Sequence, residues 1–481
     1  MLNIKRIAGD MGRFKQILDA FAVGGFAFFI KRLKLSHCLS PICRIKCFFN
    51  KSSQCPEEDL PAKFRLILES LGPTFIKIGQ ILSVRPDFIP AEYAAEFTKL
   101  QDHVPPFPFV QVKEIVEEEL SRPLENVFRS FDQVPVAAAS LAQVHKAVLK
   151  SGEVVAVKVQ RPGVKKIIEQ DMRIIFFLAG LVEQHVPEAK PFRPSAAARE
   201  FANYTLKELD FVIEGKNADR FRYNFRNNKG VKVPKIFWDC SSSKVLVMEF
   251  IEGVKMGDHE GMGRMGTNHG VLAQNCTRAC LEPVLSHGFF HADPHPGNVW
   301  VVKGNKVCYL DFGMVGIVTQ DMKRKILLCF NSLLNKEVES ALRHLLRLTE
   351  QSPSADYDAF KGEASDILLS LYIDSTKRET NAKAFYRIVA SGAKHGVIFP
   401  SNMVLLAKSL MTGEAMCMMT HKDFDLIATT RPTIERIYRE EFGPQRAMKS
   451  LQEYYPLLLE FLEKLPELSD ALLKKIGERS G

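Results

Sequence analysis

The most informative stretch of this 481-residue sequence is His291-Ala292-Asp293-Pro294-His295-Pro296-Gly297-Asn298, followed after a short interval by Asp311-Phe312-Gly313. Asp293 and Asn298 have the spacing of the aspartate and asparagine in a kinase catalytic loop. In such a loop the aspartate orients the phosphoryl acceptor, and the asparagine and the aspartate of D-F-G bind magnesium. The spacing therefore predicts a phosphoryl-transfer site with Asp293 as the catalytic aspartate and Asn298 and Asp311 as metal ligands.

The segment between the two motifs, residues 299–310, consists of two apolar runs around Gly304-Asn305. This pattern is typical of a β-hairpin, because glycine and asparagine suit a tight turn between two strands. A hairpin here would bring Asn298 and Asp311 side by side.

The stretch 291–298 admits two alternatives to a magnesium site. Histidine, aspartate and proline gather by chance in many polar loops, but the ordered combination of D-x-x-x-x-N, a hairpin and D-F-G makes chance a poor explanation. His291, Asp293 and His295 would otherwise suit zinc. However, no CxxC or HExxH spacing supports zinc at this stretch, and hard oxygen ligands favour magnesium.

The composition is that of an ordinary globular protein, with 46% hydrophobic residues, 25% charged residues and a net charge of +9. The length allows one large two-lobed unit, or two domains with an appendage. Many basic residues lie in the first fifty positions, which suits an anionic membrane surface or, equally, a solvated basic face. Because no zinc-finger or RNP motif is present, we expect no nucleic-acid partner.

The ten cysteines, without a secretory signal, indicate a reducing compartment. We therefore expect a cytoplasmic location or the matrix side of an organelle. No transmembrane helix is expected, because the apolar run at 17–30 is too short and the run at 402–419 contains charged residues. Any membrane contact should be peripheral.

Residues 131–160 have the pattern of β-strands, beginning with Val134-Pro135-Val136 and including a turn at Ser151-Gly152. The last strand ends in V-A-V-K, which places Lys158 where a kinase keeps the lysine that neutralises the α- and β-phosphates. The position of the glycine-rich phosphate loop is occupied by Ala137-Ala138-Ala139-Ser140. Because alanine rarely adopts the positive φ open to glycine, we expect a stiffer loop and altered nucleotide handling.

A helix expected at 195–225 should carry the glutamate that pairs with Lys158. Three glutamates are available on it. Glu208 is preferred over Glu200 and Glu214, a choice that depends on the resemblance described below.

The strand at 244–251 ends in M-E-F-I, which resembles a kinase hinge. In that interpretation, backbone groups of Glu249 and Ile251 bond the edge of adenine, and Met248 lies at the back of the pocket. Val144, on an earlier strand, is assigned to the same nucleotide pocket.

The chain is expected to have five parts. They are a basic leader at 1–59, a helical extension at 60–130, a kinase-like N-lobe at 131–252, a helical C-lobe with the catalytic loop at 253–450, and a C-terminal amphipathic helix at 451–481. Lys77 and Gln80 share a helix face in the second part, which by itself indicates only a solvated face. The apolar stripe of the last helix should pack against other helices in preference to a membrane or partner.

Several of these elements together resemble the UbiB-like (AarF-domain, ubiquinone-biosynthesis type) atypical protein-kinase-like family. They are Lys77-Ile78-Gly79-Gln80, the alanine-rich loop, Lys158, Glu208-Leu209-Asp210, the catalytic loop and D-F-G. The resemblance covers residues 60–420. It implies an α+β, protein-kinase-like bilobal fold with added N-terminal helices and a helical C-lobe. It also implies that the K-x-G-Q element lies over the active site, so that Lys77 and Gln80 have regulatory roles.

The resemblance implies binding of ATP and Mg²⁺ and a role in isoprenoid-lipid metabolism, particularly quinone biosynthesis, at a membrane. Two observations on the residues disfavour a protein substrate. Ala292 replaces the arginine that would bind a phosphorylated activation loop, and no A-P-E segment follows Gly313. Membrane-anchored members have C-terminal transmembrane helices, which are not found in this sequence.

The leading hypothesis is an atypical kinase or ATPase that acts on a small or lipidic partner, with Lys158 and Glu208 holding the phosphates. A nucleotide-binding pseudokinase scaffold is the first alternative, although a scaffold would not need every catalytic polar group. A lipid-binding chaperone is the second, and an ordinary protein kinase is the least favoured.

Overall fold

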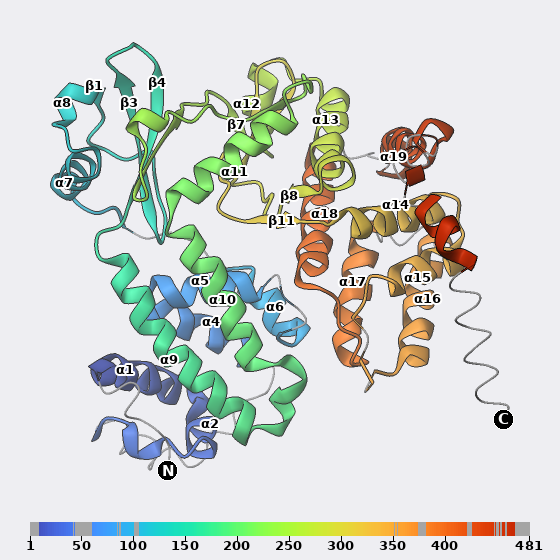
Figure 1. Ribbon diagram of the computed structural model, residues 1–481. Coiled ribbons are helices and arrows are strands. Elements are labelled where there is room, and N and C mark those ends of the chain that lie inside the picture. The colour runs from blue at the N-terminus through green and yellow to red at the C-terminus, as the bar shows by residue number, and fades with distance from the viewer. Residues whose placement is uncertain are drawn as a thin grey trace.

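The computed structural model describes residues 9–41, 43, 60–83, 85, 88–100, 105–350, 352–353, 355–373, 381–420, 426–446, 448, 452, 455–456 and 459–466. Figure 1 shows a sheet-containing lobe at the upper left, a helical lobe at the right and a group of N-terminal helices below the sheet. The mixture of an antiparallel sheet with separate helical layers confirms the predicted α+β class.

The N-lobe is built on an antiparallel sheet with the strand order β1-β3-β4-β6, and β2 pairs with β3. Val155, Val157 and Val159 on β4 are fully buried on one face, so the alternating Lys158 points to the other face. Gly152 makes the β3–β4 turn with a φ of 100°. The strands are β1 (Phe128–Phe131), β2 (Ala137–Ala138), β3 (Ala142–Leu149), β4 (Val154–Gln160) and β6 (Val245–Glu249).

One strand prediction in this lobe is wrong. Residues 134–136 form no strand, and the side chains of Val134 and Val136 are exposed. Pro135 has no N–H to donate to a neighbouring strand, which weakens pairing at this point.

The helix expected at 195–225 is broken. The structure has α10 (Pro194–Glu208) and α11 (Phe211–Asn224), separated by Leu209 and Asp210. Asp210 is extended (φ −110°, ψ 99°), and its carboxylate accepts a 3.0 Å hydrogen bond from the backbone N–H of Val212. Aspartate is a favoured N-cap residue, so Asp210 starts a second helix where a continuous one was expected.

The N-terminal helices share one hydrophobic core with α9 (Val164–His185). Arg13 reaches Asp171 on α9 with a 2.8 Å ion pair, and Asp171 is fully buried. The described part of the basic leader is therefore folded onto the rest of the protein. The helices are α1 (Met11–Phe21), a π-helix (Ala22–Phe26), α2 (Ala27–Arg32), α4 (Leu60–Leu71), α5 (Pro73–Leu82) and α6 (Ala91–Phe97), while α7 (Phe109–Leu120) and α8 (Leu124–Val127) belong to the N-lobe.

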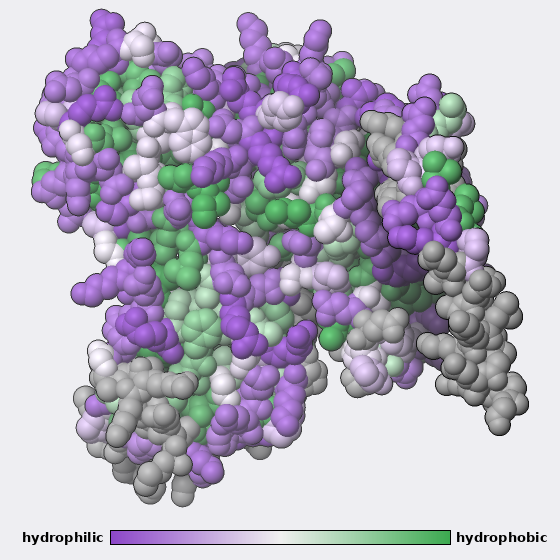
Figure 2. Space-filling model, in the orientation of Figure 1, coloured by the Kyte–Doolittle hydropathy of each residue, from purple (hydrophilic) through white to green (hydrophobic). Residues whose placement is uncertain are grey.

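Hydrophobic residues are visible on the surface of Figure 2 along the region of α9 and α10, between the hydrophilic upper lobe and the N-terminal helices. Ile167 and Phe176 on α9 and Leu206 on α10 are among the exposed apolar side chains. None of the helices in the described ranges has the length and apolarity needed to span a bilayer.

The C-lobe combines two small sheets with a helical core, in which α18 (Ser401–Thr420) has twelve buried residues. One sheet has the order β5-β10-β9-β7 and the other pairs β11 with β8. The strands are β5 (Val231–Lys232), β7 (Val254–Lys255), β8 (Phe289–His291), β9 (Val299–Val302), β10 (Lys306–Tyr309) and β11 (Val315–Ile317). The other helices are α12 (His259–Arg264), α13 (His269–Glu282), a π-helix (Pro283–His287), α14 (Gln320–Leu334), α15 (Val338–Leu346), α16 (Tyr357–Ile373), α17 (Asn381–Lys394) and α19 (Leu426–Phe442).

The expected C-terminal helix is described only in part. Residues 459–466 are helical, whereas 451, 453–454, 457–458 and 467–481 lie outside the described residues. In the described part, Leu459, Phe461, Leu462 and Leu465 are exposed. These four side chains do not pack into a core, contrary to the expectation for the apolar stripe.

Candidate active site

The catalytic loop begins at the end of β8, where the side chain of His291 contacts the backbone of the D-F-G motif. The His291 ring is almost fully buried; its Nε2 lies 2.6 Å from the backbone oxygen of Asp311, and its Nδ1 accepts a 3.1 Å hydrogen bond from the backbone N–H of Asp293. Burial lowers the pKa of His291, which favours the neutral ring that this pair of contacts requires. With both ring nitrogens engaged, His291 is a structural link between the two motifs and is a poor zinc ligand.

The predicted hairpin between the two motifs is confirmed. β9 and β10 pair antiparallel from Val299 opposite Tyr309 to Val302 opposite Lys306. Gly304 and Asn305 both have positive φ, as the tight turn requires.

At the open end of the hairpin, the backbone N–H of Leu310 donates to the oxygen of Asn298 over 3.0 Å. Asn298 and Asp311 are therefore neighbours. Their amide and carboxylate groups present hard oxygen donors, which is the donor set that fits Mg²⁺. Among the residues that the structure describes, no cluster of three histidine, cysteine or acidic side chains could hold a metal ion.

Lys158 connects the two lobes at the site. Its ammonium donates to both carboxylate oxygens of Glu214 over 2.7 and 2.9 Å and contacts Asp311 Oδ2 at 3.3 Å. Burial alone would lower the pKa of Lys158, but Asp311 and Glu214 raise it above the ordinary value. Burial likewise opposes ionisation of Asp311, yet Lys158 and the N–H of Gly313 bring the pKa of Asp311 down to about 2. Lysine and aspartate are thus both charged at neutral pH.

The pairing predicted for Glu208 is wrong. Glu214 holds Lys158, whereas Glu208 forms a 2.7 Å ion pair with Lys77 on α5. The break at Asp210 is the physical reason, because it puts the two glutamates on different helices with different directions. α11 also carries Asn217, whose side chain donates to the backbone oxygen of Phe312 over 3.0 Å and anchors D-F-G.

The Lys77–Glu208 pair lies next to D-F-G. A Cβ added at Gly313 would lie 3.6 Å from Glu208 Oε1, so the carboxylate of Glu208 borders the D-F-G turn. Gly79 on the same helix packs so tightly that a Cβ there would lie 2.1 Å from Leu100. Glycine in K-x-G-Q therefore allows α5 to reach the site, and Gln80 is the next, half-buried residue.

The residues that the sequence predicts to contact the nucleotide lie on or next to several N-lobe strands. Val144 lies opposite Lys158 in the β3–β4 register. Met248 is buried on β6, and Ile251 just beyond this strand is also buried. The backbone N–H of Glu249, predicted to bond adenine, donates to the backbone oxygen of Lys235 over 2.8 Å.

The alanine-rich loop is part of the same sheet. Ala137 and Ala138 pair with Val144 and Gln143 on β3, and Ser140 is buried. No residue from 137 to 140 has a positive φ. The loop is therefore anchored in the sheet by backbone pairing and has none of the conformations that glycine would supply.

Asp293 has a partner that sequence reasoning missed. The ammonium of Lys408 on α18 donates to Asp293 Oδ1 over 2.7 Å, and the hydroxyl of the adjacent Ser409 donates to the backbone oxygen of His291 over 2.7 Å. Burial raises the pKa of Asp293, but Lys408 and His295 outweigh burial and hold that pKa well below its ordinary value. The signal in the sequence was Lys408 as one of two charged residues, with Glu414, inside the largely apolar run at 402–419.

Comparisons with known proteins identify the family of the chain. Residues 99–345 match the ABC1 atypical kinase-like domain. The chain is 36% identical over 378 residues to "Uncharacterized protein sll1770" of Synechocystis sp., covering 78% of this chain and 64% of that protein. It is 34% identical over 417 residues to "Probable protein kinase UbiB" of Marinobacter nauticus, covering 86% and 76% of the two chains.

Two further similarities concern a plant protein and a solved structure. The chain is 34% identical over 371 residues to "Protein ACTIVITY OF BC1 COMPLEX KINASE 7, chloroplastic" of Arabidopsis thaliana, covering 76% of this chain and 53% of that protein. Its fold resembles the structure described as the Rv3197-erythromycin complex from Mycobacterium tuberculosis, with a TM-score of 0.51, 22% identity and coverage of 76% and 93%. The resemblance predicted from the sequence is confirmed, and the chain belongs to the ABC1 (UbiB-like) atypical kinase-like family.

Proposed function

We propose that the chain is a magnesium-dependent ATPase or small-molecule kinase that acts on a small or lipidic partner. The observation that carries this proposal is the position of Lys158, whose ammonium contacts Glu214 and Asp311 at the point where the two lobes meet. This is the arrangement that holds the phosphates of ATP in protein-kinase-like enzymes.

In the proposed reaction, an oxygen of the acceptor, either water or a hydroxyl, attacks the γ-phosphorus of ATP. The bond from that phosphorus to the β,γ-bridging oxygen breaks, and its electron pair leaves with ADP. Asp293 orients the acceptor and accepts its proton, which then passes to solvent. Lys158 binds the α- and β-phosphates, and Glu214 keeps its ammonium in position.

Asn298 and Asp311 would hold the metal. When bound, Mg²⁺ neutralises charge on the phosphates and helps to align them. Asp311 also contacts Lys158. The proposed metal ligand and the proposed phosphate-binding lysine would therefore hold each other in position.

The resemblance to UbiB-like proteins supports an isoprenoid lipid or a quinone precursor as the partner. The exposed Val23 in the π-helix and the exposed Phe28 on α2, close in sequence to Lys31, support peripheral contact with an anionic membrane. Peripheral contact with an anionic membrane is therefore part of the proposed function.

The test measures ATP turnover by the wild-type protein with Mg²⁺ or with EDTA, each with and without vesicles of anionic phospholipid. We expect turnover with Mg²⁺, background rates with EDTA, and a severalfold increase with the vesicles. Nucleotide binding without magnesium-dependent turnover under every lipid condition would contradict the proposal and favour a pseudokinase scaffold.

A further inference from the structure

The helix α18 contacts the catalytic loop at two successive residues. Lys408 binds the carboxylate of Asp293, and Ser409 binds the backbone of His291. Lys408 comes from 115 residues further along the chain than its partner. A helix of the C-lobe core therefore supplies a contact to the residue that would orient the phosphoryl acceptor.

The catalytic loop has no permanent cation of its own. Its eight residues from His291 to Asn298 include neither lysine nor arginine. His295 lies 3.8 Å from Asp293 Oδ2 and is 47% exposed, whereas the side chain of Lys408 is 17% exposed and lies within hydrogen-bond distance. Among the described residues, Lys408 is therefore the permanent cation that the structure places against Asp293.

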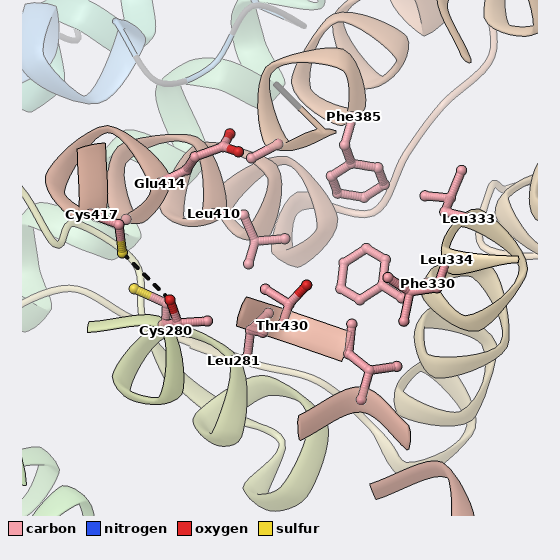
Figure 3. A pocket seen from close by; sticks show the side chains of 14 residues that line it. Cys280, Leu281, Phe330, Leu333, Leu334, Phe385, Leu410, Glu414, Cys417 and Thr430 are labelled. Atoms are coloured by element: carbon pink, nitrogen blue, oxygen red, sulfur yellow. Dashed lines mark hydrogen bonds between the residues drawn. The ribbon is translucent and has the colours of Figure 1, made fainter. Parts of the chain in front are cut away.

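α18 is well suited to hold that cation in a fixed place. At its N-terminus, the hydroxyl of Ser401 donates to Glu200 over 2.9 Å, and Glu200 also forms an ion pair with the buried Arg85. On the side of α18 opposite Lys408, Leu410 and Cys417 point into a pocket that residues of α13 and α14 also line (Figure 3).

The alternative is that Lys408 only attaches α18 to the loop. Ser409 already makes such an attachment with a neutral hydroxyl and the backbone of His291. Burying an ammonium is costly unless the charge is paired. Here the partner is the carboxylate with the central role in the proposed reaction, which attachment alone does not explain.

We propose that Lys408 is a positioning residue for phosphoryl transfer. It holds the Asp293 carboxylate in the orientation that the acceptor requires and gives the catalytic loop the positive charge that its own sequence lacks. This inference rests on the proposed function. It predicts that Lys408 affects the chemical step and not the binding of nucleotide, because the proposed phosphate-binding group is Lys158, which Glu214 holds in position.

The test compares Lys408→Met, Lys408→Arg, Ser409→Ala and the control Lys394→Met, which removes a lysine that is 69% exposed on α17. Turnover number, KM for ATP and calorimetric nucleotide affinity are measured for each. Lys408→Met should lower kcat about fiftyfold, within the hundredfold that misplacing a reacting group by about 1 Å can cost. Its KM and nucleotide affinity should stay within about threefold of wild type, as expected when only the transition state is affected.

The conservative variant separates charge from packing. Lys408→Arg should recover most of the lost kcat, because the guanidinium keeps a charged donor for Asp293. Lys394→Met should stay close to wild type, and Ser409→Ala should lower kcat far less than Lys408→Met, because it leaves the charge beside Asp293 in place. If Lys408→Met does not fold, Lys408→Gln takes its place, because glutamine can still donate to Asp293 without a charge.

The outcomes distinguish this inference from the proposed function. An absence of turnover in wild type would overturn both. Normal wild-type turnover with an unchanged or increased kcat in Lys408→Met would overturn the role of Lys408 alone. A loss that appears equally in Ser409→Ala, or that Lys408→Arg does not restore, would show that Lys408 serves only to attach the helix.

Discussion

Replacing Asp311 with asparagine is expected to lower ATP turnover about a thousandfold. Asparagine keeps the shape of the side chain and can still accept the hydrogen bond from the N–H of Gly313. However, it removes the negative charge that faces Lys158 and that would bind the metal. A metal ion contributes several kcal/mol to stabilising a phosphoryl-transfer transition state, and about 4 kcal/mol corresponds to about a thousandfold in rate.

The measurement is the steady-state rate of ATP turnover at saturating Mg²⁺. The control is Asp321→Asn, which makes the same chemical change at a C-lobe aspartate that is 72% exposed and paired with Lys325. The control should turn over ATP at the wild-type rate. Equal turnover by Asp311→Asn and wild type would rule out Asp311 as a metal ligand.

Replacing Glu214 with glutamine should lower turnover about two hundredfold. Glutamine has nearly the same volume but leaves the ammonium of Lys158 without the carboxylate that holds it at 2.7 and 2.9 Å. Lys158 would then pair more fully with Asp311 and compete with the metal. Loss of one preorganised electrostatic contact costs about 10²–10³ in rate, which gives the expected size.

A double-mutant cycle on nucleotide affinity identifies the true partner of Lys158. Combining Lys158→Met with Glu214→Gln should reveal a coupling of about 1–3 kcal/mol, as is usual for residues in contact. The matched cycle with Glu208→Gln should give a smaller coupling, because Glu208 is bound to Lys77. A larger coupling with Glu208 would contradict the pairing.

Much of the fold could be predicted because it depends on local chemistry. The turn at Gly304-Asn305 and the alternating valines before Lys158 each specify an element within a few residues. The ends of these elements carry Asn298, Asp311 and Lys158, so predicting the elements also brought these three candidates together. The family resemblance then indicated that Lys77 reaches the same region, where the structure has it paired with Glu208.

The remaining features depend on contacts that no local pattern specifies. Glu208 and Glu214 were equally plausible on a continuous helix, and only the break at Asp210 separates them. Lys408 could not be identified as a site residue from the sequence, because its partner Asp293 is 115 positions away and no local pattern links the two.

The most direct test of the central claim is a crystal structure of the protein with Mn²⁺ and a non-hydrolysable ATP analogue, with the metal located by anomalous scattering. We predict an anomalous peak within about 2.0–2.3 Å of oxygens from both Asp311 and Asn298, a distance typical of hard divalent cations. The phosphates should lie against Lys158. An analogue bound away from Lys158, or a metal that contacts neither Asp311 nor Asn298, would contradict the account.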